Sequence, residues 1–559
     1  MRERIASWID RHGQTQAARW MAWGLVLAYL VPAAIVMWRA PRVPYADGWR
    51  FLGYFVQQRF PRDVFMVDNG HFEVIPNLVR VLDLRLFDAG QGLQVIAGML
   101  LLAASLLVAW RCVRELPRPG TRVAAMLVVV LGLCWLGNMR VLAHANESVH
   151  AYAITLALLL GIGALTRRAG PVRIQDAIAA ATCGLAAALS FGSGIAVFPA
   201  LLVVALLRHA NWRVLAILIG SGLAAFVLLR AAGAGAMPGW MPLRQIDLAS
   251  RWLAGPWLYA AWPALDPAIA ERIPVAGARS MLMPMARGWQ AIFGPATLAR
   301  WPHAAVGALG IVALAILSLR SWRRGDEACT RLIGLGLAWF ALGVGAMVAI
   351  VRSGYFDAYP EQLLAPRYVV WSSLFWAGLG LAMVSRARRE GRALVIAVLV
   401  ATALLPSQLW MSRLAESMRT TAAQTAVAVA VGVLEPGWPT GESVPAEISA
   451  VRPALRVARA AVFAWPETTT LDRPLPMTAH DVPASGWTLE PAANLFGAPG
   501  RRVRLHAIAP GVPRLLLIDG DGVVRGLAIR DPEAGPDAWL GWTGDARADA
   551  IRAASLPPP

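Results

Sequence analysis

The chain has 559 residues, of which 57% are hydrophobic and only 15% are charged. Soluble domains carry about 25% charged residues, so this composition excludes an ordinary soluble protein and favours a multi-pass membrane protein. The formal net charge of +18 does not indicate nucleic acid as a partner, because the arginine excess falls in short segments between apolar runs.

Apolar runs recur almost to residue 410 and predict an α-helical polytopic membrane protein with about 11 transmembrane helices. The expected spans are residues 20–38, 93–110, 123–136, 151–165, 177–190, 195–207, 214–229, 303–319, 332–351, 368–384 and 393–409. Short loops on one side carry several Arg each, so the positive-inside rule places the N-terminus in the cytoplasm and the C-terminal region outside. The all-arginine, cysteine-poor composition suits a bacterial inner membrane with a periplasmic outer face.

Two long segments are expected outside the bilayer, a first outer loop at 39–92 and a second at 231–302. The second is rich in Trp and Pro and is expected to hold short surface or re-entrant helices. After the transmembrane domain, 1–410, residues 411–559 are long enough for a separate periplasmic domain of mixed α and β structure. Its expected helices are 420–434 and 449–463, and its expected strands are 503–508, 514–518 and 523–529.

The sequence predicts neither a disulfide framework nor a definite metal site. Disulfides form in oxidising compartments, and the cysteines fall in predicted spans or cytoplasmic loops: Cys112, Cys134, Cys183 and Cys329. The Asp-Gly-Asp-Gly segment at 519–522 favours a hairpin and lacks the terminal Glu of a calcium loop. The acids of the first outer loop permit a divalent metal without requiring one.

Residues 44–87 of the first outer loop are too polar to span a bilayer but are rich in aromatic and aliphatic side chains. Apolar residues recur at helical spacing, at Phe72, Ile75, Val79, Leu82 and Leu86. Glu73, Asn77 and Arg80 fall on the other face. This pattern predicts a helix lying at the membrane surface, and we interpret the loop as the catalytic ledge of a membrane enzyme.

Asp47 is the first candidate catalytic residue. It lies a few residues outside the first span in an aromatic segment, where a carboxylate can act as general base toward an acceptor hydroxyl. The alternative is a turn residue beside Gly48.

A second group follows at residues 68–73. Asp68, Asn69 and His71 are candidate substrate-binding residues, with His71 as a proton carrier or as a hydrogen-bond donor to phosphate. Glu73 is a further candidate catalytic carboxylate. The alternative is a turn followed by a helix cap.

Two later loops complete the expected site. Between the third and fourth spans, Arg140 and Asn146 are candidate substrate-binding residues and Glu147 is a second carboxylate, with helix capping as the alternative. Beside the tenth span, Arg352, Arg367 and Tyr368 are expected to bind a lipid phosphate or pyrophosphate. An Arg that reaches up to the headgroups is the alternative there.

Taken together, the sequence resembles the GT-C superfamily of polytopic membrane glycosyltransferases, in its uncharacterised bacterial branch. The resemblance covers roughly residues 20–410 and rests on the order of the segments YADGW, DNGHFEVIPNLVRVLDLRLF, SFGSGIAVFPALL and LLAPRYVVWSSLFW. The chain departs from the family pattern at Gly48, which replaces a second acid. It departs again at Gly70 and Phe72, which stand where Glu and Arg would be.

The resemblance implies surface helices in the first outer loop and a polyprenyl-phosphate-linked sugar donor that is bound from the lipid phase. It implies transfer on the outer face to an envelope glycan, lipid or protein acceptor. By the same resemblance, Asp47 is the base or the acceptor-orienting carboxylate and Arg367 holds the donor phosphate. Two alternatives stay open: a catalytically degenerate assembly protein, and a transporter or flippase of lipid-linked sugars, which would need ionisable residues midway along several spans.

Overall fold

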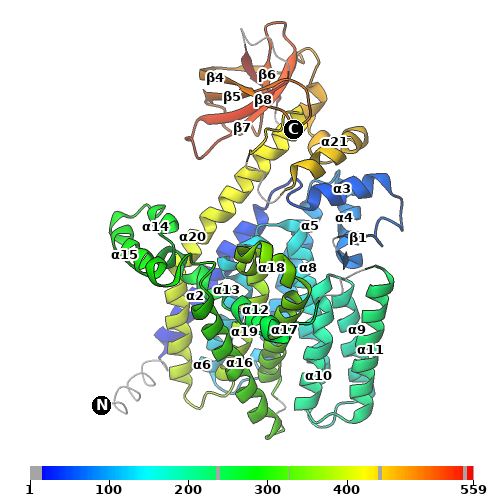
Figure 1. Ribbon diagram of the computed structural model, residues 1–559, viewed down its shortest axis with the longest axis vertical. Coiled ribbons are helices and arrows are strands. Elements are labelled where there is room, and N and C mark those ends of the chain that lie inside the picture. Colours follow the sequence, from blue (N-terminus) through cyan, green and yellow to red (C-terminus); the bar gives the residue numbers. More distant parts are fainter. Residues whose placement is uncertain are drawn as a thin grey trace.

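The computed structural model describes residues 15–68, 70–233, 239–325, 328–438, 443–544 and 551–557. Long helices packed side by side form the main body, and a smaller unit built on a β-sheet stands at one end of it (Figure 1). One hydrophobic core lies among the long helices, and a second joins the first loop to the β-sheet unit.

Within the described residues, nine helices are long and apolar enough to cross a bilayer. They are α2 (Gln16–Trp38), α5 (Gly92–Val113), α6 (Pro119–Cys134), α8 (Ala145–Thr166), α11 (Trp212–Ala231), α16 (Arg300–Trp322), α17 (Cys329–Val351), α19 (Pro366–Val384) and α20 (Glu390–Val431). Two shorter apolar helices, α9 (Ile174–Ala188) and α10 (Val197–Leu207), lie between α8 and α11. Every expected span therefore coincides with a helix, and the predicted multi-pass helical fold is confirmed.

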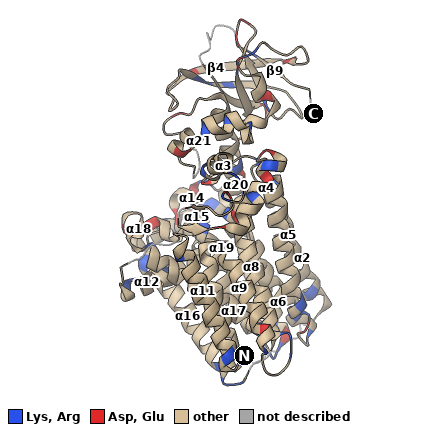
Figure 2. Ribbon diagram, turned by 90° about the vertical axis from the view of Figure 1, so that its right-hand side faces the viewer, with Lys and Arg blue, Asp and Glu red and all other residues tan. Residues whose placement is uncertain are grey.

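The two ends of the bundle differ in structure and charge. The loop face carries α3 (Gly48–Gln57), α4 (Val74–Phe87), α7 (Met139–Leu142) and α18 (Ser353–Ala358). The arginine face is the opposite end, where basic residues gather in the connections between helices (Figure 2): Arg111, Arg114, Arg167, Arg168, Arg320, Arg323, Arg324, Arg388 and Arg389. The first loop and the β-sheet unit share the loop face, as an odd number of spans requires. That the loop face is the periplasmic one stays a prediction from the positive-inside rule.

Helix α4 lies on the bundle with its polar side inward. Asn77 and Arg80 are buried, whereas Leu78, Leu82 and Leu86 are exposed. A soluble protein would reverse this arrangement, because its apolar stripe faces the core. The exposed apolar side fits a helix at a membrane surface, as the spacing of residues predicts.

Asp83 joins α4 to the first long helix that follows it. Its carboxylate is fully buried and accepts hydrogen bonds from the backbone N–H groups of Gln91 and Leu93, each at 2.9 Å. The side chain of Gln94 donates a third bond at 3.3 Å. The first N–H groups of a helix have no partner within it, so Asp83 caps α5 from a neighbouring element.

The second loop is helical, as expected. It contains α12 (Pro242–Trp252), α13 (Gly255–Leu265), α14 (Pro267–Glu271) and α15 (Ala276–Phe293). Helix α15 exposes Met281, Met285 and Ile292, and this apolar side fits a helix that lies in a membrane surface.

Helix α20 connects the bundle to the C-terminal unit without a break. It has 42 residues and passes straight through residues 410–411, where the sequence suggests a domain boundary. Helix α21 (Pro445–Ala458) then packs on α3, with Val451 against Gly53. The C-terminal unit therefore contacts the first loop directly (Figure 1).

The described part of the C-terminal unit contains one antiparallel sheet with the strand order β3-β9-β6-β7-β8-β5-β4. Its strands are β3 (His480–Val482), β4 (Ala484–Ala492), β5 (Gly500–Ala507), β6 (Leu515–Ile518), β7 (Val524–Arg530), β8 (Ala538–Thr543) and β9 (Arg552–Ser555). The three expected strands correspond to β5, β6 and β7. In the β6–β7 hairpin, Asp519 accepts from the N–H groups of Asp521 and Val523 and from Arg525, so its carboxylate stabilises the turn.

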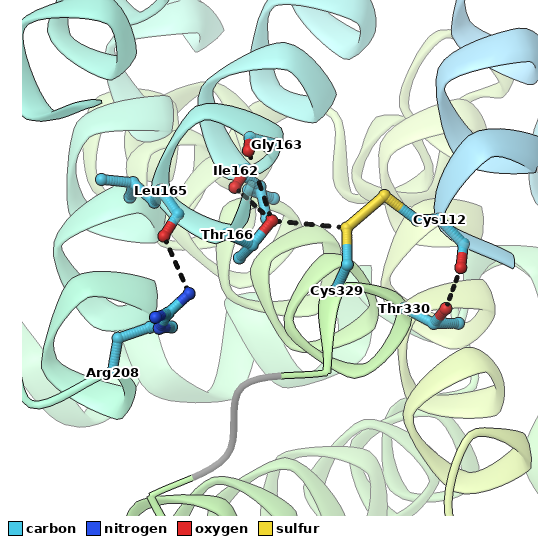
Figure 3. Close-up of a disulfide and its surroundings, with 8 residues drawn as sticks. All are labelled: Cys112, Ile162, Gly163, Leu165, Thr166, Arg208, Cys329 and Thr330. Carbon is cyan, nitrogen blue, oxygen red and sulfur yellow. Dashed lines mark hydrogen bonds between the residues drawn. A yellow bond between two sulfur atoms is a disulfide. The ribbon is translucent and has the colours of Figure 1, made fainter. Parts of the chain in front are cut away.

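The expectation of no disulfide was wrong: Cys112 at the end of α5 is bonded to Cys329 at the start of α17, with their Cα atoms 5.6 Å apart (Figure 3). The two residues meet because both helices reach the arginine face at neighbouring positions. Thr330 donates a hydrogen bond to the Cys112 carbonyl at 2.8 Å and links the same two helices. The redox compartment alone gives no sign that two cysteines 217 positions apart in the chain are neighbours in the fold.

Replacing Asp83 with Ala should destabilise the protein by about 2 kcal/mol, because two buried backbone N–H groups lose their acceptor. The measurement is the free energy of unfolding, or the Tm, of purified protein in lipid. Glu115→Ala is the matched control, because Glu115 is an exposed acid near the other end of α5. Equal stability of the two variants would contradict the role of Asp83 as a cap.

Candidate active site at the loop face

Arg50 on α3 gathers three carboxylates. Its guanidinium donates to both oxygens of Asp68, each at 2.6 Å, and to Glu447 of α21 at 2.5 Å. Asp47, just before α3, lies 3.3 Å from the same guanidinium. The bonds to Asp68 raise the pKa of Arg50, so it stays charged. The Asp47 side chain is 50% exposed, against 12% for Asp68, so Asp47 is the more accessible acid.

Arg80 on α4 is the centre of a buried polar network. It donates to Glu73 Oε2 and to Asn77 Oδ1, each at 2.5 Å. Its Nε donates to Asn146 Oδ1 of α8, and its guanidinium lies 4.3 Å from the centroid of the Phe51 ring. Burial raises the pKa of Glu73, and the charge of Arg80 opposes this rise. The network ties the first loop to the start of a transmembrane helix.

A second buried pair lies beside it. Arg140 on α7 is 2.7 Å from Glu147 on α8. His144 caps α8, because its Nδ1 accepts from the Glu147 N–H at 3.3 Å. Its Nε2 therefore carries the proton and donates to the Tyr45 carbonyl at 3.3 Å. Burial, with the charge of Arg140, lowers the pKa of His144 well below its ordinary value, so this imidazole is neutral.

Two histidines stack on one aromatic ring. The centroid of Phe191 lies 4.0 Å from that of His71 and 4.4 Å from that of His150. Gly192 permits this approach, since a Cβ there would lie 2.5 Å from His71 Nδ1. In the described part of the chain, the buried Nδ1 atoms of both histidines have no hydrogen-bond partner. Burial, and then the charge of Arg352, lowers the pKa of His71 to about 4.

The segments that follow α17 and begin α19 contribute two cations. Arg352 donates to the Tyr368 hydroxyl at 3.1 Å. Arg367 donates to Gln362 at 3.0 Å, and its guanidinium lies 5.2 Å from the centroid of the Tyr368 ring. Tyr368 thus holds both guanidinium groups at one end of α19.

These groups share one electrostatic neighbourhood. The charges of Asp47 and Asp68 contribute to the raised pKa of Glu73. The charge of Arg352 lowers the pKa of His71, and that of Asp68 opposes it. The charges of Asp68, from the group around Arg50, and of Arg352 therefore both act on His71.

Most of the expected site residues fall into the groups around Arg50, Arg80, Arg140, Phe191 and Tyr368. They are Asp47, Asp68, His71, Glu73, Arg140, Asn146, Glu147, Arg352, Arg367 and Tyr368. Asn69 lies outside the described residues. Residues that sequence reasoning did not select as site residues are Arg50, Asn77, Arg80, His144, His150 and Phe191. Glu73, Asn77 and Arg80 follow helical spacing, which was a usable signal, whereas nothing local connects Phe191 to the two histidines.

The described residues of the loop face do not form a group of metal ligands. Among the residues that the structure describes, no set of three His, Cys, Asp or Glu side chains is placed to hold a metal ion. The acids instead face arginines, at Arg50, Arg80 and Arg140. Binding of a divalent metal by these acids would require them to leave their ion pairs.

The fold and the site together define a multi-pass helical membrane protein with a cluster of ionisable side chains at one end of the bundle, beneath a C-terminal sheet. No protein-family model matches the sequence, and no curated protein matches it.

The solved structures similar to this chain include the oligosaccharyltransferase of Archaeoglobus fulgidus, as a complex with Zn and sulfate. The similarity has a TM-score of 0.38 at 14% identity and covers 75% of this chain and 58% of that one. A second structure of archaeal oligosaccharyltransferase AglB from Archaeoglobus fulgidus, with an inhibitory peptide and a dolichol-phosphate, has a TM-score of 0.36 at 13% identity. It covers 77% of this chain and 59% of that one. The chain thus spans less than two thirds of either.

The buried, neutral His71 predicts a pH dependence of stability. Its folded pKa of about 4 lies below the ordinary value of 6.5, so its contribution is complete above pH 6.5 and is lost as the pH falls toward 4. The loss between pH 7 and pH 5 is on the order of 2 kcal/mol for this residue. Unfolding of wild type and His71→Gln, measured at both pH values, should show a smaller pH dependence in the variant. An unchanged dependence would contradict a depressed pKa.

Proposed function

We propose that this protein is a membrane glycosyltransferase that moves a sugar from a polyprenyl-phosphate-linked donor to a cell-envelope acceptor at the loop face. In a bacterial inner membrane, this face is periplasmic. The proposal is supported by the order of segments that resembles the GT-C superfamily and by the gathering of the acids and arginines of those segments at one end of the bundle.

One observation carries the proposal: Asp47 is the most exposed of the three candidate catalytic acids, and its 3.3 Å contact with Arg50 is longer than the buried ion pairs of Glu73 and Glu147, at 2.5 and 2.7 Å. Its side chain is 50% exposed, and those of Glu73 and Glu147 are 5% and 15% exposed. A general base must reach the proton that it accepts, so Asp47 is assigned this role. Glu73 and Glu147 hold Arg80 and Arg140 in place as positioning residues.

The proposed reaction is a direct displacement at the anomeric carbon. The acceptor hydroxyl loses its proton to Asp47, and its oxygen forms the new bond to that carbon. The bond from the carbon to the phosphate oxygen breaks, and polyprenyl phosphate leaves with the electron pair. Attack from the side opposite the leaving group inverts the anomeric centre. The protonated Asp47 then returns its proton to water, to which its side chain is exposed.

The leaving phosphate needs positive charge beside it, because charge develops on its oxygen as the bond breaks. Arg352 and Arg367, which meet at Tyr368, supply two guanidinium groups. Such groups bind phosphate oxygens in pairs of hydrogen bonds. His71, with its unpartnered buried Nδ1, is near enough to Arg352 for that charge to lower its pKa.

The position of the charged residues favours an enzyme over a transporter. A transporter of charged lipids needs ionisable groups midway along its spans. In the described spans α2, α5, α8, α11, α16, α17 and α19, the Asp, Glu and Arg side chains stand within a few residues of the helix ends. The chemistry therefore lies at the surface of the bundle.

Asp47→Asn should lower turnover at least 100-fold, because general bases contribute about 10²–10⁴ to rate. Wild type and variant, purified in lipid, are given a mixture of polyprenyl-phosphate sugars, and donor consumption is followed by mass spectrometry. Asp88→Asn is the control, because Asp88 is an exposed acid with a left-handed backbone that Asn tolerates. Unchanged turnover in Asp47→Asn would refute its role, and no turnover in wild type with any donor would favour the degenerate assembly protein.

A further inference from the structure

A cavity of about 270 Å³ opens between α2 and α20 near the loop face. We call it the α2/α20 cavity. Its volume is close to the lower end of the range for ligand pockets, about 300–1,000 Å³. Its walls come from the last turns of α2, from α20 beyond the predicted span, and from Ala143. None of the candidate site residues lines it.

The walls change from apolar to charged along the membrane normal. Pro32 and Ile35, on the last turns of α2, are apolar. Arg39 follows Trp38, which is 58% exposed at the end of that helix, where interfacial Trp residues are typical. On α20, the charged lining residues come after the predicted span. This gradient matches a lipid, with its chain beside the apolar wall and its headgroup beside the charged one.

The charge at the headgroup level favours an anion. Arg39 makes no ion pair and no side-chain hydrogen bond that involves another described residue. Arg419 is paired with Glu416 on its own helix, and both side chains are nearly half exposed. Such exposed pairs contribute little to stability, so Arg419 can turn toward a stronger acceptor. Two cations and one acid leave a net positive charge at this wall.

The cavity borders a segment that carries candidate site residues. Ala143, part of its wall, directly precedes His144, whose imidazole holds Tyr45 and the start of α8. Helix α7, which carries Arg140, packs against α2, α20 and α8. A headgroup in the cavity therefore lies next to the segment that carries Arg140 and His144.

We propose that the α2/α20 cavity binds the headgroup of a phosphate-bearing anionic lipid, and that this lipid is the acceptor of the transferred sugar. Its phosphate lies between Arg39 and Arg419, and its chain lies along Pro32 and Ile35. The acceptor role rests on the proposed function, whereas binding of the lipid does not. Donor and acceptor then approach the site from two sides of the bundle.

Lipid binding is tested first, on full-length protein in phosphatidylcholine membranes that contain some phosphatidylglycerol. Native mass spectrometry should find retained phosphatidylglycerol on the wild type. The double variant Arg39→Gln/Arg419→Gln should retain it at least tenfold less, since it removes the charge-assisted hydrogen bonds of both guanidinium groups to the phosphate. Equal retention by wild type and double variant would overturn the proposal.

Arg413→Gln and Val31→Trp are the matched controls, the first for the loss of charge and the second for filling of the cavity by Ile35→Trp. Arg413→Gln removes an exposed charge from the same helix outside the cavity and should retain lipid as the wild type does. Ile35→Trp fills the cavity without changing charge and should also lose the lipid. Val31→Trp, at an exposed position of α2 outside the cavity, should retain the lipid.

Excess inorganic phosphate should not displace the lipid, because the lipid chain contributes to binding. Displacement would instead indicate a site for free phosphate and would overturn the proposal.

The acceptor role is tested by following the sugar. With a donor that the wild type consumes, the labelled sugar should appear on a lipid, and Arg39→Gln/Arg419→Gln should lower this product at least tenfold. Loss of lipid binding with unchanged transfer would refute the acceptor role and leave a structural lipid site. Failure of the wild type to consume any donor would refute the proposed function and the acceptor role together, while the retention experiment would still decide the cavity.

Discussion

Guanidinium groups that are buried at the loop face need hydrogen-bond acceptors around them. This requirement determines how the first loop packs on the bundle. Arg80 is only 3% exposed, and a buried charge without a partner costs several kcal/mol. Glu73, Asn77 and Asn146 provide its acceptors from two separate segments. The position of α4 on the bundle is therefore fixed by electrostatics as well as by packing. Arg50 is partly exposed, at 30%, and its bond to Glu447 joins the C-terminal unit to the first loop.

Much of the fold could be predicted because apolar runs of sufficient length have few structures available to them in a bilayer. The surface helix α4 could also be predicted, because its apolar and polar residues separate at helical spacing. Strands β4 and β8 were missed, although they flank the predicted β5 in the sheet. Strand β8 is buried along its whole length, so it lacks the alternation that marks a half-exposed strand.

The candidate site was predictable only in part, for a similar reason. Single residues such as Asp47 and Arg352 stand out locally as ionisable groups just outside a span. Their partners come from distant segments: Glu447 is 397 positions from Arg50, and Phe191 reaches two histidines on other elements. The disulfide between Cys112 and Cys329 belongs to the same class of contact. Such pairings depend on how helices are placed around one another, and one sequence does not contain that placement.

Helix α20 also acts as a rigid spacer. From residue 410 to Val431, 22 residues of unbroken helix rise about 33 Å. An α-helix turns by about 100° and rises about 1.5 Å per residue. One inserted or deleted residue would therefore both rotate the sheet around the helix axis and change its distance from the bundle. It would also separate α21 from α3. The length of this stretch therefore holds the C-terminal sheet at one distance and one angle above the site.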